Sequence, residues 1–236
     1  MKKILFTAVA VVSAGVAVQA QTTGNPPTFP STPPNLYGNI DASQSTYTQN
    51  TVGNDTLTLA LDATAHFHSP DAVTPPPVNN LGTGVYGVST GLGGDGRSFW
   101  NYDFAATSSL SDLANYTFNL TIKNEGNGLS TSFNPSVILD NKGTAGSSFG
   151  NSESLDFTTG AFPLGQLFFG NIGYDPNAND TYDVTLTAQG VTGGPVASDS
   201  IKIIAGRGAV PDASSTMALM SFGLGGLGLM SRRFRK

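Results

Sequence analysis

Apolar and polar residues alternate along four stretches in the middle of the chain. In each stretch the apolar side chains recur at every second position, which places them on one face of an extended strand. A half-buried strand of a β-sheet has this pattern, because one face of the sheet contacts the core and the other contacts water. The four predicted strands are TLTLAL (56–61), FWNYDF (99–104), YTFNLTIK (116–123) and TYDVTLTA (181–188).

Shorter apolar runs predict further strands, namely VYGVST (85–90), SVILD (136–140), QLFFGNI (166–172) and SIKII (200–204). Turn-forming residues cluster between the runs, as in NEGNG (124–128) and DPNAND (175–180). No stretch between the two chain ends repeats apolar residues at helical spacing, and LSDL (110–113) is at most one helical turn. The pattern therefore predicts an all-β fold, an antiparallel β-sandwich of either immunoglobulin-like or jelly-roll topology.

The first 20 residues have the layout of a secretory signal peptide. Lys2 and Lys3 are followed by an apolar run over residues 4–12, which is short for a membrane span. Small side chains near Ala20 predict cleavage after that residue.

The last 27 residues combine a short motif, an apolar span and a basic end. Residues 213–231 carry no formal charge over 19 positions. As a helix this span would measure about 28 Å, close to the hydrocarbon thickness of a bilayer. Four cations that mark the cytoplasmic side follow at once: Arg232, Arg233, Arg235 and Lys236. The sequence therefore predicts a C-terminal transmembrane helix.

The motif Val210-Pro211-Asp212 stands directly before this span. The tail thus contains a short motif, an apolar span and a basic end, in that order. The tail resembles the PEP-CTERM sorting signals of bacterial exported proteins, nearest to the VPDSG-CTERM variant, with Ala213 and Ser214 in place of Ser and Gly. The resemblance implies recognition by an exosortase-type transpeptidase. It also implies transient anchoring in the inner membrane through the C-terminal helix, then release to the cell surface or the extracellular space.

Between the two targeting ends, composition divides the chain into a stalk and a body. Residues 21–35 are rich in Pro, Thr and Ser and predict an extended stalk, and residues 36–209 form the predicted β-sandwich body, with 1–20 and 210–236 as targeting segments. DAVTPPPVNN (71–80) predicts a long surface loop within the body.

Charge and cysteine content narrow the classes of partner and chemistry. Residues 21–209 hold five basic residues against 15 acidic ones, a formal charge of −10. Nucleic acid and anionic lipid need clustered cations, so neither is expected as a partner of the body. The chain contains no cysteine, which excludes disulfides, thiolate catalysis and cysteine-ligated zinc.

One loop resembles part of a calcium-binding sequence. Asp175, Asn177 and Asn179 place oxygen ligands at alternate residues, as calcium loops do, and Asp183 is a fourth candidate ligand. Asp180 and Leu186 stand where an EF-hand needs Gly and Glu, so a complete EF-hand is excluded. A looser calcium site and a plain β-turn remain as the two interpretations, and the turn is favoured.

Two histidines and one aromatic strand are the remaining candidates for chemistry. His66 and His68 would share a strand face near Asp71 and could bind a metal, although surface positions are expected for them. Sugars could stack on Trp100, Tyr102 and Phe104 if these were exposed, but burial in the core is expected. GLGGDG (91–96) leads into a strand, not a phosphate-binding helix.

These observations leave two classes of function. The first is an exported cell-surface or extracellular-matrix protein with a structural or adhesive body and no catalytic site. The alternative is a secreted carbohydrate-binding or carbohydrate-active protein on the same scaffold, with extracellular polysaccharide as its partner. Fold alone does not separate them.

Overall fold

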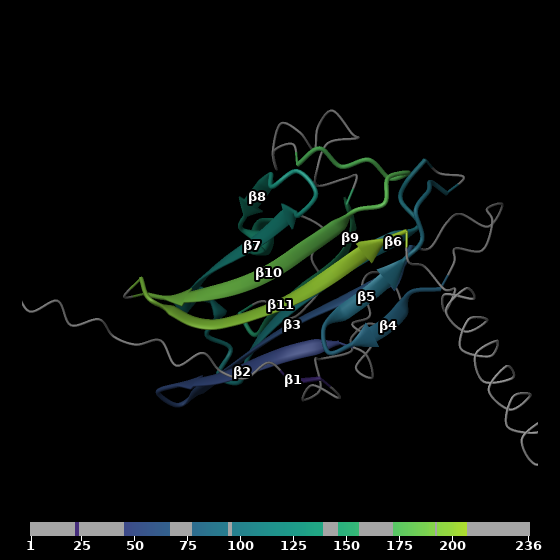
Figure 1. Cartoon of the computed structure of the whole chain (residues 1–236). Coiled ribbons are helices and arrows are strands. Elements are labelled where there is room, and N and C mark those ends of the chain that lie inside the picture. Colours follow the sequence, from purple (N-terminus) through teal and green to yellow (C-terminus); the bar gives the residue numbers. More distant parts are fainter. Residues whose placement is uncertain are drawn as a thin grey trace, which may run out of the picture.

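A computed structural model of the chain describes residues 22–23, 45–66, 77–93, 96–138, 146–155, 172–191 and 193–206. Within these ranges the chain forms two β-sheets that pack against each other (Figure 1). Sheet A contains, in spatial order, β1 (Thr22–Thr23), β2 (Thr46–Val52), β3 (Asp55–Ala65), β6 (Trp100–Ser108) and β9 (Ser148–Ser154). Sheet B contains, in spatial order, β4 (Asn79–Gly82), β5 (Val85–Val88), β11 (Pro195–Ala205), β10 (Thr181–Gly190), β7 (Tyr116–Asn124) and β8 (Ser130–Phe133). The described residues also include two 3₁₀ helices, η1 (Leu113–Asn115) and η2 (Pro135–Val137).

Most neighbouring strands are antiparallel, and four hairpins join β2 to β3, β4 to β5, β7 to β8 and β10 to β11. One pair departs from the predicted antiparallel sandwich, because β5 and β11 run parallel, with Val85 opposite Lys202 and Val88 opposite Ala205. These two strands are far apart in the chain, so no tight hairpin fixes their relative direction.

The hydrophobic core lies between the inner faces of the two sheets. The clearest alternation is in β10, where every second residue from Tyr182 to Ala188 is fully buried and the residues between them are partly exposed. Burying one large apolar side chain contributes about 1.5–3 kcal/mol. The core therefore stabilises the described body without disulfides. Its largest fully buried members include Tyr86, Tyr102, Phe104, Leu57, Leu59, Leu61, Leu120, Ile122, Leu155 and Ile172.

An aromatic cluster closes the core near the start of β10. Ring centroids of Trp100 lie 5.8 Å from Tyr182 and 6.2 Å from Tyr174, and Tyr174 lies 5.7 Å from Tyr182. Tilted and edge-to-face pairs at such distances are favourable beyond their buried area. Trp100, Tyr102 and Phe104 are 2 %, 0 % and 1 % exposed, which confirms the core interpretation of this strand and removes these rings as a sugar platform.

The strands with regular alternation are confirmed. β3, β7 and β10 contain three of the predicted stretches whole, and β6 contains FWNYDF from Trp100 onward. β5 and β11 contain most of VYGVST and all of SIKII. SVILD was predicted as a strand, and this is wrong for its first residues. Pro135 begins η2 there, and the Asn134 side chain accepts a hydrogen bond from Ser136 N at 3.0 Å, which favours the tight turn.

Two segments that were predicted as loop or stalk contain short strands in the structure. Asn79 and Asn80 end the predicted surface loop but lie in β4, paired with β5. Thr22–Thr23, within the predicted stalk, forms β1 and pairs with Thr46 and Tyr47 of β2. The signal peptide, its cleavage position at Ala20 and most of QLFFGNI lie outside the described residues.

The predicted C-terminal transmembrane helix over residues 213–231 also lies outside the described residues. Among the residues that the structure does describe, no helix is long and apolar enough to cross a membrane.

A buried carboxylate links three elements at the far end of the sandwich from Trp100. Asp55, 5 % exposed at the start of β3, accepts hydrogen bonds from Ser108 Oγ at 2.9 Å, Ser109 Oγ at 3.0 Å, Leu110 N at 3.1 Å and Tyr116 Oη at 2.9 Å. Burial raises the pKa of Asp55, but these hydrogen bonds outweigh the burial and hold it below its ordinary value. The carboxylate therefore fixes the β6–β7 connection to β3.

Candidate functional site

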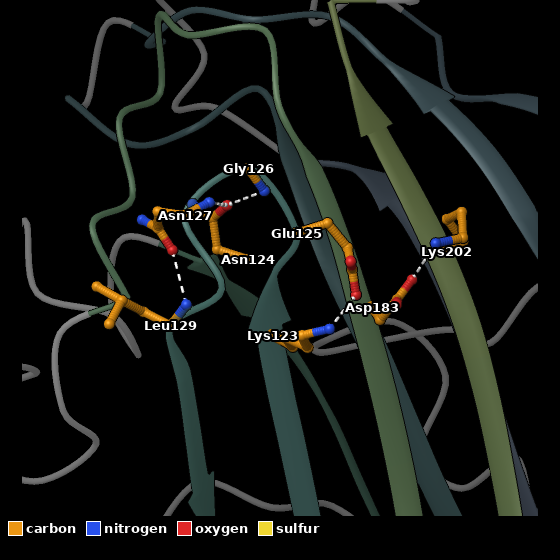
Figure 2. A network of polar contacts seen from close by, with 8 residues as sticks. All are labelled: Lys123, Asn124, Glu125, Gly126, Asn127, Leu129, Asp183 and Lys202. Carbon is orange, nitrogen blue, oxygen red and sulfur yellow. Dashed lines mark hydrogen bonds and ion pairs between the residues drawn. The ribbon is translucent and has the colours of Figure 1, made fainter.

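The turn between β7 and β8 is built by two asparagine side chains. Asn124 Oδ1 accepts from Gly126 N at 2.8 Å, and Asn127 Oδ1 accepts from Leu129 N at 2.8 Å (Figure 2). The two side-chain amides also donate to Ile172 O, from Asn127 at 2.8 Å and from Asn124 at 3.3 Å. These bonds attach the turn to the segment that leads into β10.

A row of charges crosses the outer face of sheet B beside this turn. Register places Lys123 of β7 and Lys202 of β11 on either side of Asp183 of β10. Lys202 Nζ lies 2.5 Å from Asp183 Oδ1, and Lys123 Nζ lies 2.7 Å from Glu125 Oε1 (Figure 2). The hydrogen bond with Lys123 lowers the pKa of the Glu125 carboxyl and raises the pKa of the lysine. Each lysine is thus already paired with an acid.

A shallow depression of about 630 Å³ lies between this turn, the loop before β10 and the end of β11. A Cβ on Gly126 would overlap Asp180 Oδ1, and a Cβ on Gly206 would overlap Asn179 Oδ1. Gly206 also has φ of +88°, a backbone conformation that favours glycine. Glycine at these two positions lets three segments meet. The depression is lined by Glu125, Gly126, Asn179, Asp180, Thr181, Ile204, Ala205 and Gly206.

Of the four residues predicted to bind calcium, Asn179 lines this depression, and Asp175 and Asp183 have partners of their own. Asp175 Oδ1 accepts from Asn177 N at 2.9 Å, as in an Asx turn, and Asp183 is paired with Lys202. Asn179 Oδ1 lies against Gly206. Within the described ranges, no three Asp, Glu or His side chains are grouped as a metal site would need. The turn interpretation accounts for these contacts, and calcium binding stays a prediction.

Calcium at this loop is expected to raise stability by at most about 1.4 kcal/mol at millimolar concentration, given the weak class of extracellular sites. For a domain of this size that is a shift of a few degrees in Tm. The check is a set of melting curves in chelator, in calcium and in magnesium, repeated with Asp175→Ala. Equal midpoints, or a calcium shift that survives Asp175→Ala, would exclude the loop as a calcium site.

The structure places only one of the two histidines. His66 is 7 % exposed, and its Nδ1 lies 2.7 Å from Asn101 Oδ1. Its backbone N–H donates to Phe99 O at 2.9 Å. His68 and Asp71 lie outside the described residues. His66 is therefore a buried hydrogen-bonding residue, and the surface position predicted for it is wrong.

Two buried aspartates face each other across β3 and β6, and sequence reasoning missed them. Asp62 and Asp103 are register partners and are 1 % and 0 % exposed. Burial raises the pKa of Asp103 to about 7, and the nearby hydroxyls of Ser152 and Thr64 act in the opposite direction. Neither oxygen of Asp103 makes a hydrogen bond of ordinary geometry with the described residues. The sequence did contain one sign of this buried carboxylate, because Asp103 interrupts the otherwise largely aromatic strand FWNYDF.

The outer face of sheet B is polar and carries hydroxyl groups on neighbouring strands. Thr121 Oγ1 lies 2.7 Å from Ser132 Oγ, and Thr187 Oγ1 lies 3.3 Å from Ser198 Oγ. Asn119 Nδ2 donates to Thr121 Oγ1 at 3.2 Å. Among the outward-facing positions of β7, β10 and β11 in the described residues, none holds an aromatic ring. At the outward positions of these three strands the face offers hydrogen-bonding groups and no stacking platform.

The fold and these sites define an all-β body of two packed sheets with a polar outer face. The C-terminal tail carries the information on how the chain is sorted. Residues 209–234 match the VPDSG-CTERM motif, a PEP-CTERM-like exosortase sorting signal. The motif indicates an exported protein that an exosortase-type enzyme processes, with a surface or extracellular destination. No curated protein matches the chain, and no solved structure matches it either.

Proposed function

We propose that this protein is a non-catalytic cell-surface or extracellular-matrix protein whose β-sandwich body has a structural or adhesive role after sorting. The observation that carries the proposal is the sorting motif at residues 209–234 joined to an all-β body. Before processing, the C-terminal helix anchors the chain in the inner membrane. After processing, the body is delivered to the cell surface or the extracellular polymer layer.

The distribution of acids supports a non-catalytic body. Hydrolysis of a glycosidic bond needs two carboxyl groups about 5–10 Å apart that both reach the sugar. Asp62 and Asp103 are register partners, but both are buried and cannot reach a polymer. Glu125 is exposed and Asp183 is half-buried, and each is paired with a lysine.

The polar outer face of sheet B supports a second candidate, polysaccharide binding. Hydroxyl and amide groups on adjacent strands can donate to and accept from sugar hydroxyls. The lack of aromatic rings at the outward positions of β7, β10 and β11 favours weak, repeated contacts over a stacked sugar site.

Glycan-array binding by the purified protein, with and without calcium, separates the two candidates. A structural role predicts no glycan above background. Binding that Thr121→Ala and Thr187→Ala both weaken would establish the polysaccharide candidate, with the exposed Val191→Ala as the matched control. Release of shortened glycans would contradict the non-catalytic proposal.

The secreted product is expected to lack both ends of the chain. The signal peptide is removed after Ala20, so the product begins near Gln21, and processing removes the apolar tail. Intact-mass spectrometry of protein from the extracellular fraction measures both ends at once. Full-length chain that retains Arg232 to Lys236 as the dominant extracellular species would contradict the prediction.

A further inference from the structure

The folded body holds the chain firmly up to the point where the tail leaves it. Ala205 N donates to Asp180 O at 2.8 Å, and Gly206 N donates to Val88 O at 2.9 Å. Gly206 also contacts Asn179 closely enough that a Cβ would not fit. Backbone hydrogen bonds therefore attach the last residue of β11 to the loop before β10, and Gly206, directly after β11, to β5.

The sorting motif begins very close to this attachment. Val210 follows Gly206 by four residues, and an extended chain spans at most about 3.3–3.6 Å per residue. Val210 is therefore within about 14 Å of Gly206. An end of a β-sandwich is wider than this reach, because the sheets alone pack about 10 Å apart and strands within a sheet lie about 4.8 Å apart. An enzyme that acts at the motif must come against this end of the body.

The surface that would contact the enzyme surrounds Gly206, after which the tail begins. Glu125, Asn179, Asp180 and Gly206, here named the exit surface, all line the depression at the end of β11. Glu125 and Asp180 are the charged residues of that lining, and both are acidic. Figure 2 shows Glu125 at the end of β7, beside β10. Lys123 partly offsets the charge of Glu125, so Asp180 supplies most of the negative charge of this surface. Charge complementarity then favours a partner with cationic groups near its active site.

We propose that the exit surface docks on the exosortase-type enzyme while the tail is processed, with cationic groups of the enzyme facing Glu125 and Asp180. This inference rests on the proposed processing of the tail. The spacer of three residues, 207–209, makes the contact obligatory at natural length. The body thus helps to position its own tail.

The test follows tail removal over time in cells that make the enzyme and the full-length chain. The variant Glu125→Gln/Asp180→Asn removes both charges and keeps an oxygen at Asp180, whose Oδ1 accepts from Thr181 N at 2.8 Å. We expect its processing rate to fall about threefold or more, because rim charges act mainly on association rates. As a control for folding, the melting midpoint of each purified variant is compared with that of the unchanged protein.

Asp112→Asn is the matched control. Asp112 is exposed and lies at the opposite end of the sandwich, because β6 starts at the Trp100–Tyr174 contact and ends at Ser108, close to Asp112. Its processing rate is expected to equal that of the unchanged chain. A loss of rate in Asp112→Asn equal to that of the double variant would contradict the inference.

A second arm lengthens the spacer with about ten Gly and Ser residues after Gly208, which extends the reach by up to about 35 Å. In this background the double variant is expected to be processed as fast as the lengthened chain with Glu125 and Asp180 intact. If the double variant with the natural spacer is processed as fast as the unchanged chain, the docking inference is wrong, but the proposed function still stands. Absence of processing in the unchanged chain overturns the proposed function and the inference together.

Discussion

Replacing Asp55 with alanine is expected to lower the free energy of unfolding by about 3–5 kcal/mol, because the buried carboxylate is the shared acceptor of several donors, which lose it at once. The carboxylate accepts from two serine hydroxyls, one backbone N–H and the Tyr116 hydroxyl. Urea unfolding of the secreted protein measures the difference. Asp112→Ala, an exposed aspartate near the same end, is expected to change stability by less than about 0.5 kcal/mol.

The contribution of Asp55 also depends on pH in a defined direction. Its pKa lies below the ordinary value in the folded protein, so the folded state favours the charged form. Its stabilising contribution is present above the ordinary pKa near 4 and is lost as the pH falls below it. An Asp55→Ala penalty of the same size at pH 7 and at pH 3 would contradict this assignment.

Replacing Asp103 with asparagine is expected to stabilise the protein at pH 8. Burial raises the pKa of Asp103 to about 7, so the folded state binds this proton more tightly than the unfolded state does. Stability from this group is fully present below pH 4 and is lost as the pH rises to about 7, a change on the order of 4 kcal/mol. The amide carries no charge and avoids this cost.

Unfolding curves of the unchanged protein and of Asp103→Asn between pH 4 and pH 8 test this expectation. The two proteins should differ little near pH 4 and most at pH 8, with the variant the more stable. Asp112→Asn is the control, because its side chain is exposed. A variant that is less stable than the unchanged protein at pH 8 would show that Asp103 is needed as a charged group.

Two strands that the sequence did not predict, β2 and β9, have polar residues at inward positions. In β2 the inward Thr46 donates from Oγ1 to Asp199 Oδ2 at 3.0 Å, and in β9 Asn151 Nδ2 donates to Glu153 Oε1 at 2.7 Å. Because these pairs satisfy each other inside the sandwich, TYTQNTV and SFGNSES show no apolar alternation. Period-two hydrophobicity detects a strand only where its inner face is apolar.

The candidate site was only partly predictable for a different reason. The loop at residues 175–180 was visible as a turn because Asp, Asn and Pro bond locally. The approach of Asp180 to Gly126, and of Asn179 to Gly206, depends on how distant segments pack, and no local pattern encodes it. The ion pair of Asp183 with Lys202 likewise depends on the register of two paired strands.

The position of β11 determines how the body responds to mechanical force. β11 lies inside sheet B, with β10 hydrogen-bonded along one side and β5 along the other (Figure 1). In the sequence the tail follows β11 after Gly206. Inter-strand hydrogen bonds in antiparallel pairs run perpendicular to the strands, so a pull along the tail loads many of them together in shear. Tension on the tail therefore meets the resistance of a whole strand instead of peeling the sheet open one bond at a time.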